Sequence, residues 1–596
     1  MYGYYRFAVA SPAITVADVV ANLQEMGRIY AQAEQNQAAL IFFPHLSLTG
    51  CSCGDLFFHG DLLAAAGAAA VTFAAQCGST IAVFGLPCCW HGKVYDLFAV
   101  AQNGKIKGYF PAECADARCF DAGVPTEIAG VPCGSEVLLD AGMFTITSGR
   151  GSCGDVQLVS LPGAALPGSA AHLQNLCAAV SREELSAVLM TSGCAGESTA
   201  DLIWSAQSGI FNCGTTLVAT SAVHENSTIA FADVDVEALH YQRRRQQLRR
   251  KEAAVAISCD PVPESPDLQF ARLRQRPYLP EDDVDLPLFC RETLEIQSAG
   301  IAARVKRCHA AKMVIGISGG LDSTLALLVL RRACEKLGID TSSIIAVTMP
   351  GFGTTGRTRN NAIALAEVIG AAIREISIAE SCMQHFEDIG HDPECRNSVY
   401  ENSQARERTQ ILMDIANAVN GIVVGTGDLS EAALGWCTYN GDQMSMYGVN
   451  ASIYKSMISA LLEYEATVLP EAAEILQDVV ATPVSPELLP AEDCEITQKT
   501  ESLLGPYELH DFFLWHFMVQ GAGAEKVRFL AETVFGGIYD SEEIARCCQL
   551  FFRRFFQQQF KRSASPDAVQ ASAVSLSPRG AWQMPSDISG VLWQQK

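Results

Sequence analysis

The segment from residue 312 to residue 332 constrains the fold more than any other part of this 596-residue chain. A short apolar run, Lys312-Met-Val-Ile-Gly-Ile, leads into the glycine-rich Ser318-Gly-Gly-Leu-Asp-Ser-Thr324, and an apolar helix pattern follows over 325–332. Glycines let backbone N–H groups approach a phosphate closely, and the N-terminus of a helix adds positive potential. This strand, turn and helix therefore predict an anion site, formed by Ser318, Gly319, Gly320 and Ser323.

A carboxylate, Asp322, lies inside this loop. It does not bind a phosphate directly, because like charges repel, so its presence implies a bridging Mg²⁺ ion. The loop is not a Walker loop, which ends in Gly-Lys-Ser/Thr. A second apolar run, Ile344–Pro350, follows the helix and is expected to be the next strand. This order predicts a doubly wound parallel sheet.

Short apolar runs also recur in the first 220 residues, and helix patterns such as 17–35 lie between them. The runs cover 38–44, 81–86, 97–101, 105–109, 144–147, 187–190 and 216–219. Asn103-Gly104 predicts a hairpin turn between two of them. Many strands with interleaved helices indicate a layered α/β or α+β unit.

The composition changes after about residue 242. A basic run, Gln242-Arg243-Arg244-Arg245, is either a solvated helix end or a patch that contacts a ligand or another domain. Six prolines between 257 and 290 indicate an extended linker. We therefore expect three parts, with residues 1–250 and 291–596 as domains and 251–290 as the linker.

Composition excludes several classes of function. The net charge of −24 disfavours general nucleic-acid binding, because an acidic surface repels phosphate backbones. The apolar run 62–75 is shorter than the roughly 20 residues that a membrane helix needs, and the N-terminus lacks a secretory pattern. No two of the 22 cysteines are spaced as CxxC, which disfavours zinc ribbons. We expect a cytoplasmic protein that binds neither nucleic acid nor membrane.

The motif Ser-Gly-Gly-x-Asp-Ser resembles the signature of the ATP pyrophosphatases, which cleave ATP between its α and β phosphates. Further segments narrow the resemblance: 348–354, 401–406, 425–431, 435–439, 454–455, 498–501, 505–513 and 555–563. Together they resemble NAD synthetase in its long, glutamine-dependent form. The match weakens at 566–573, where one cationic substrate contact is expected to be missing.

The resemblance implies that ATP adenylylates the carboxylate of nicotinic acid adenine dinucleotide and that ammonia then displaces AMP. It implies Asp322 and Glu431 as Mg²⁺ ligands, Thr426 as an ATP contact, and Lys455 as the group that neutralises phosphate charge. The residues expected to hold the dinucleotide are Asn402, Glu431, Trp436, Cys437, Thr438, Tyr439 and Lys561. A homo-oligomer is also expected, a dimer or larger, with an octamer as one option.

Residues 1 to about 245 resemble a nitrilase-type glutamine amidotransferase domain, an α-β-β-α sandwich, through 43–50, 52–57, 131–134 and 196–202. Such domains use a Glu base, a Lys for the oxyanion and a Cys nucleophile. Here the Glu position is His45 and the Lys position is Ala112. The nucleophile position falls on Gly149 or on Cys153, depending on which neighbouring pattern is matched. We expect a degenerate glutaminase.

Three functions remain open from these residues. The first is an amide-forming synthetase supplied with free ammonia. The second is the same synthetase with working glutamine hydrolysis through Cys153 and His45. The third is a non-catalytic assembly protein, which the intact 318–323 loop and Glu431 disfavour. Related tRNA thiolases are disfavoured because the chain has neither cysteine pairs of that type nor a basic face.

Overall fold

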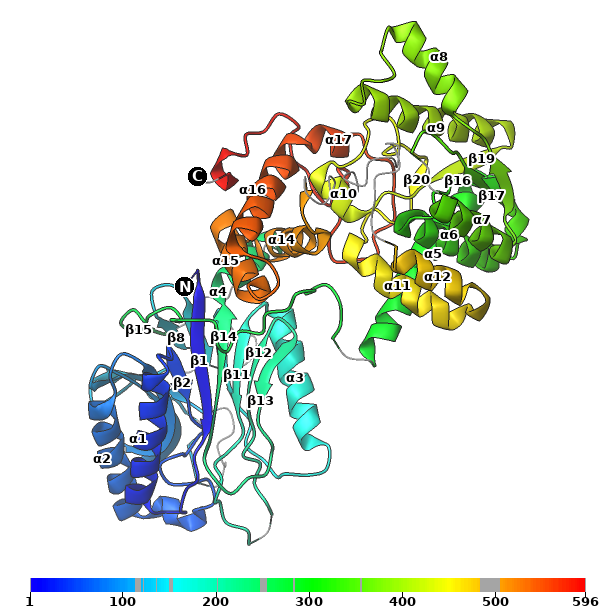
Figure 1. The fold of residues 1–596 in the computed structure, drawn as a ribbon. Coiled ribbons are helices and arrows are strands. Elements are labelled where there is room, and N and C mark those ends of the chain that lie inside the picture. Colours follow the sequence, from blue (N-terminus) through cyan, green and yellow to red (C-terminus); the bar gives the residue numbers. More distant parts are fainter. Residues whose placement is uncertain are drawn as a thin grey trace. The chain divides into compact units, whose positions relative to one another are not determined.

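The computed structural model describes ten stretches of the chain: 2–112, 119–121, 123–134, 137–148, 154–200, 202–246, 255–281, 284–353, 356–482 and 504–594. The chain divides into two compact units, Met1–Arg272 and Leu273–Lys596 (Figure 1). The finer division into two domains and a linker stays a prediction. Across the described stretches, no helix is both long and apolar enough to cross a bilayer.

Unit 1 contains two large sheets. The first has the order β14-β1-β2-β3-β4-β5 and the second the order β13-β12-β11-β10-β9-β8-β15. The strands of the first sheet are β1 (Tyr4–Ser11), β2 (Leu40–Phe42), β3 (Ile81–Trp90), β4 (Lys93–Gln102), β5 (Lys105–Pro111) and β14 (Thr228–Asp235). Those of the second are β8 (Val137–Asp140), β9 (Thr145–Ser148), β10 (Val156–Ser160), β11 (Ala187–Thr191), β12 (Ser208–Asn212), β13 (Thr215–Ala219) and β15 (Val255–Ser258).

The two sheets share one apolar core, and helices cover their outer faces (Figure 1). Phe7, Phe42 and Phe98 of the first sheet meet Ile146 and Leu189 of the second in this core. Helices α1 (Val19–Gln35) and α2 (Gly60–Gln76) pack on the first sheet, and α3 (Ser169–Glu183) packs on the second. A further helix, α4 (Val236–Gln246), follows β14. The expected α-β-β-α sandwich is confirmed.

The predicted strands and helix of unit 1 are present with small shifts in their ends. Asn103 and Gly104 connect β4 to β5 as expected, and both have positive φ angles (49° and 76°), which suits Asn-Gly in a tight hairpin. Residues 255–258, which we placed in the linker, form β15 and pair with β8. Ile257 is buried there, and the prolines begin only after this short strand.

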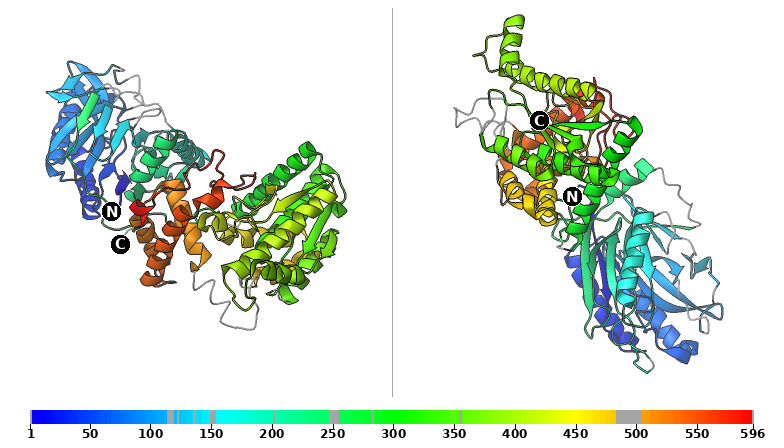
Figure 2. Two further views of the ribbon diagram at one scale, coloured as in Figure 1. Left: turned by 90° about the horizontal axis from the view of Figure 1, so that it is seen from above. Right: turned by 90° about the vertical axis from the view of Figure 1, so that its right-hand side faces the viewer.

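Unit 2 is built on a parallel sheet with the order β18-β17-β16-β19-β20. Its strands are β16 (Lys312–Gly316), β17 (Ile344–Thr348), β18 (Ala372–Glu375), β19 (Gly421–Gly425) and β20 (Tyr447–Gly448). Helices α8 (Ala379–Ile389) and α9 (Ser398–Ala418) share a buried cluster with the sheet, and α6 (Leu321–Leu337) and α7 (Gly356–Ile369) lie on the other face (Figure 2). The doubly wound sheet is confirmed.

The other described helices of unit 2 pack on α6 and α7 or on one another. They are α5 (Asp285–Cys308), α10 (Leu429–Leu434), α11 (Lys455–Val468), α12 (Ala473–Val480), α14 (Tyr507–Gln520), α15 (Ala524–Phe535), α16 (Ser541–Gln557) and α17 (Gln559–Ser563). The strand order reverses between β16 and β19. In doubly wound sheets, ligands bind outside the carboxyl ends of the strands at this reversal. We therefore expect the ligand site at the loops that follow β16 and β19.

Candidate active site

The glycine-rich loop after β16 leads directly into α6. The Ser318 N–H donates to Ser323 Oγ (3.2 Å), and the Gly320 N–H donates to Ser318 Oγ (3.2 Å). Gly319 has a φ of +84°, and a Cβ there would lie 1.9 Å from a backbone oxygen of Thr358, so this position requires glycine. The two serines hold the loop against the first turn of α6. The four predicted residues of the anion site are thus together at the N-terminus of a 17-residue helix.

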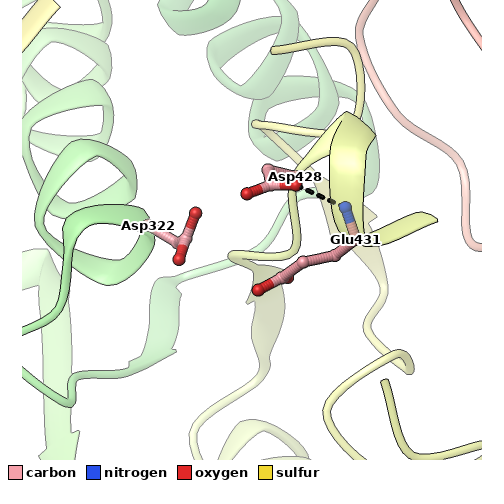
Figure 3. Close-up of side chains that lie close together, drawn as sticks. All are labelled: Asp322, Asp428 and Glu431. Atoms are coloured by element: carbon pink, nitrogen blue, oxygen red, sulfur yellow. Dashed lines mark hydrogen bonds between the residues drawn. The ribbon is translucent and has the colours of Figure 1, made fainter. Parts of the chain in front are cut away.

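Three carboxylates meet beside this loop (Figure 3). One lysine, Lys455, contacts them. Asp322 comes from the first turn of α6, and Asp428 and Glu431 come from the segment after β19. Asp428 caps α10, because its Oδ1 accepts from the Glu431 N–H at 2.7 Å. Oxygen atoms of all three carboxylates lie within 4.8 Å of one another.

The Lys455 ammonium contacts all three carboxylates from the N-terminus of α11. Its Nζ donates to Asp322 Oδ2 at 2.7 Å and to Glu431 Oε1 at 2.9 Å. Asp428 Oδ2 is 2.8 Å away and forms an ion pair without hydrogen-bond alignment. Lys455 is buried, so this is a desolvated cluster with three formal negative charges around one positive charge.

The pKa values of the cluster follow from burial and from this imbalance. Burial raises the pKa of Glu431 to about 7 and that of Asp428 well above its ordinary value, although Lys455 opposes both shifts. Burial alone would lower the pKa of Lys455, but the surrounding carboxylates outweigh it and raise the pKa well above normal. The cluster therefore favours an additional cation.

The residues fit a divalent cation. Asp322 Oδ1 is buried and has no hydrogen-bond partner among the described residues. Carboxylate oxygens are the ligands that Mg²⁺ prefers, and it commonly binds one or two of them together with phosphate oxygens. Asp322 and Glu431, the expected ligands, lie close together, and Asp428 is an additional candidate ligand. Their metal role stays a prediction.

The residues expected to hold a dinucleotide gather around the segment after α10. Thr438 Oγ1 donates to Asn402 Oδ1 on α9 at 2.7 Å. Lys561 Nζ donates to the backbone oxygens of Gly435 and Cys437, both at 2.7 Å. The Arg554 guanidinium lies 5.1 Å from the ring centre of Trp436, and Tyr439 is exposed. The fold therefore brings these residues together, and the Lys561 ammonium is hydrogen-bonded to backbone carbonyls.

Thr426 and Asp322 share one side-chain donor that the sequence analysis missed. Asn450 Nδ2 donates to the backbone oxygen of Asp322 (2.9 Å) and to that of Thr426 (3.1 Å). Asn450 is fully buried, so it ties the loop after β16 to the loop after β19. Asp428 was also missed, although it stands in the Gly425–Glu431 segment whose resemblance was noted. No motif or residue spacing in the sequence predicts this role of Asn450.

In unit 1, the Glu-position residue His45 is buried beside a cysteine that the sequence did not single out. His45 Nε2 lies 3.1 Å from Cys51 Sγ, and its Nδ1 lies 3.3 Å from Ser160 Oγ. Glu197 accepts from the backbone N–H groups of Cys51 (2.6 Å) and Ser52 (3.0 Å). Gly149 and Cys153 lie outside the described residues, so which of them takes the nucleophile position stays open.

The pKa shifts of His45 and Cys51 disfavour activation of a nucleophile at this site of unit 1. Burial lowers the pKa of His45 to about 4, and burial together with Glu197 raises the pKa of Cys51 well above 9.0. Both groups are therefore neutral at pH 7. Ala112 is buried at the Lys position, and its N–H donates to the Asp96 backbone oxygen at 3.1 Å. Its methyl group offers neither charge nor a hydrogen bond.

Comparison with known proteins identifies the family of this chain. The family model described as NAD synthase matches residues 293–549. A glutamine-dependent NAD(+) synthetase of Mycobacterium tuberculosis is 32% identical over 99% of this chain and 97% of the relative, and that of Mycobacterium leprae is 31% identical over the same shares. A crystal structure of a glutamine-dependent NAD(+) synthetase from Cytophaga hutchinsonii covers 99% of this chain and 98% of its own, with 17% identity. The TM-score of that comparison is 0.43. On the strength of the full-length relatives, the chain belongs to the family of glutamine-dependent NAD(+) synthetases.

Proposed function

We propose that this protein is an NAD synthetase that amidates nicotinic acid adenine dinucleotide with free ammonia, using ATP and Mg²⁺. The observation that carries the proposal is the cluster of Asp322, Asp428, Glu431 and Lys455 beside the anion loop, in which Asp428 and Lys455 are buried. It provides ligands for a cation and a positive charge at the position where a triphosphate would lie, next to the N-terminus of α6.

In the first step, a carboxylate oxygen of the dinucleotide attacks the α-phosphorus of ATP. The bond to the β-phosphate bridging oxygen breaks, so pyrophosphate leaves and an acyl-adenylate remains. The loop of Ser318–Ser323 holds phosphate oxygens through its N–H and hydroxyl groups. Lys455 stabilises the charge that develops on the phosphates. Bound Mg²⁺ would neutralise phosphate charge and orient the chain of phosphates.

In the second step, ammonia attacks the acyl carbon, AMP leaves with the bonding electrons, and the nitrogen loses a proton. That proton is released to solvent. Asn402 and Thr438, which are hydrogen-bonded to each other, are the residues proposed to contact the dinucleotide.

Free ammonia is the proposed nitrogen source because the sequence resemblance puts His45 and Ala112 at the two positions where a glutaminase uses Glu and Lys. Loss of one oxyanion donor costs roughly 10² to 10³ in rate, and Ala112 offers no such donor from its side chain. A neutral imidazole with a pKa of about 4 is a weak base for a thiol at pH 7. Glutamine hydrolysis through Cys153 remains the alternative, and the experiment below separates the two.

The purified protein should form NAD with ammonium chloride, and it should form at most about a hundredth as much per second with glutamine. Cys51→Ala and Cys153→Ala variants should keep the ammonium-supported rate. Glutamate release is measured in parallel. Release at the rate of NAD synthesis, abolished in Cys153→Ala, would establish the glutaminase alternative. Glutamate release that is abolished in Cys51→Ala would instead identify Cys51 as the nucleophile. Sedimentation of the same preparation tests the expected homo-oligomer.

A further inference from the structure

One buried carboxylate of unit 2 lies next to the reaction centre without belonging to it. Asp511 is on α14 and is fully buried. Ser430 Oγ donates to its Oδ1. The Ser456 N–H donates to its Oδ2 at 3.0 Å, and Ser456 Oγ donates to the same oxygen at 2.5 Å. Asp511 therefore accepts three hydrogen bonds from two other helices.

Both partners are sequence neighbours of groups in the cluster. Ser430 precedes Glu431 in the first turn of α10, and Ser456 follows Lys455 in the first turn of α11. Ser430 Oγ also accepts from the Lys455 N–H at 2.8 Å. Asp511 thus joins the N-termini of the two helices that carry Glu431 and Lys455.

Other groups of unit 2 support this junction from two sides. The Tyr507 ring, in the first turn of α14, has its centre 5.4 Å from Lys455 Nζ. Tyr278 forms a hydrogen bond with Ser456 Oγ and stacks on Tyr454, with ring centres 4.1 Å apart. The start of α11 is thereby held by contacts on several sides, and Asp511 is the carboxylate that binds Ser456 in its first turn.

We propose that Asp511 is a positioning residue for the reaction, which sets the distance between Lys455 and Glu431 by holding their neighbours Ser456 and Ser430. This inference rests on the proposed NAD synthetase function. The physical reason is that two short helix ends joined through one carboxylate move together. A displacement of about 1 Å at a reacting centre can cost 10²-fold in rate.

Asp511→Asn is the informative change because it keeps the size of the side chain. An amide has one oxygen, whereas Asp511 uses two oxygens to accept three hydrogen bonds. If the amide nitrogen faces Ser456, it meets the backbone N–H, and two donors oppose each other. If it faces Ser430, that hydroxyl loses its acceptor. In either orientation the tie between α10 and α11 is weakened.

The matched variants separate positioning from stability. Ser456→Ala removes one of the three bonds without changing charge. Ser298→Ala is its control, because Ser298 is a buried serine of unit 2 whose hydroxyl bonds within its own helix, to Leu294 O at 2.7 Å and Glu295 O at 3.2 Å. Glu465→Gln is the control for Asp511→Asn, because Glu465 is a buried carboxylate on α11 that is paired with Arg332.

The test uses the full-length protein with saturating ammonium chloride, and measures kcat, KM for ATP and for the dinucleotide, ATP binding by calorimetry, and thermal unfolding. For Asp511→Asn we expect kcat to fall about 10- to 100-fold, with both KM values and ATP affinity within about twofold of wild type. The kcat of Ser456→Ala should also fall, whereas Ser298→Ala and Glu465→Gln should keep the wild-type kcat.

Two results would overturn the placement: an Asp511→Asn kcat within twofold of wild type, or a kcat loss that Glu465→Gln shares at an equal fall in melting temperature. If Asp511→Asn does not fold, Ser456→Ala decides, and an unchanged kcat there rejects the inference. Wild-type protein that binds ATP but forms no NAD would overturn the proposed function and this inference together. An active wild type with an unaffected Asp511→Asn overturns the inference alone.

Discussion

Acidification should destabilise unit 1 through His45 by an amount that the structure sets. Burial lowers the pKa of this imidazole from 6.5 to about 4, so its pKa in the folded state is about 2.5 units below that in the unfolded state. At about 1.36 kcal/mol per unit, the full effect is about 3 kcal/mol. The imidazole is enclosed by Cys51 and Ser160.

The sign follows from proton binding. Below pH 6.5 the unfolded chain protonates His45, whereas the folded protein stays neutral there until about pH 4. The contribution of His45 to stability is therefore fully present above pH 6.5 and is lost as the pH falls through this range. At pH 4.5 the loss is about 2.5 kcal/mol.

The measurement compares wild type with His45→Gln. Hydrogen exchange of peptides from β1–β4, followed by mass spectrometry, reports the free energy of opening of unit 1 at pH 7.5 and pH 4.5. Between pH 7.5 and pH 4.5, the free energy of opening should fall by about 2.5 kcal/mol more in wild type than in His45→Gln. His59→Gln is the matched control, because His59 is an exposed histidine of the same unit. Equal losses in wild type and His45→Gln would refute the reasoning.

Three further changes test other parts of the structure. Asp322→Asn should lower pyrophosphate exchange by at least about 10²-fold, because a cation ligand and a partner of the buried ammonium are lost; near-normal exchange would reject the assignment. Gly319→Ala should abolish ATP binding in calorimetry, since its Cβ would lie 1.9 Å from a backbone oxygen. Arg6→Met should lower the urea-unfolding free energy of unit 1 by about 3 to 5 kcal/mol, because it removes the cationic partner of buried Asp233, whereas the exposed Arg28→Met should cost less than about 1 kcal/mol.

Much of the fold could be predicted because its signals are local. The hairpin at Asn103-Gly104 and the loop of Ser318–Ser323 depend on residues a few positions apart, and both are present as expected. The parallel sheet of unit 2 followed from a strand, helix and strand in succession. The strand over 255–258 was missed because its partner, β8, lies more than 100 residues away in the chain.

The site divides in the same way. The sequence by itself, through its motifs and their resemblance to a family, determined the anion loop and named Asp322, Glu431 and Lys455. Only the tertiary structure decided that Lys455 lies 2.7 Å from Asp322, 133 positions away, and that Asp511 joins the helices beside it. It also placed His45 beside Ser160, which is 115 positions away in the chain. The physical reason is that burial and charge balance depend on which distant segments pack together, and a local pattern does not contain that information.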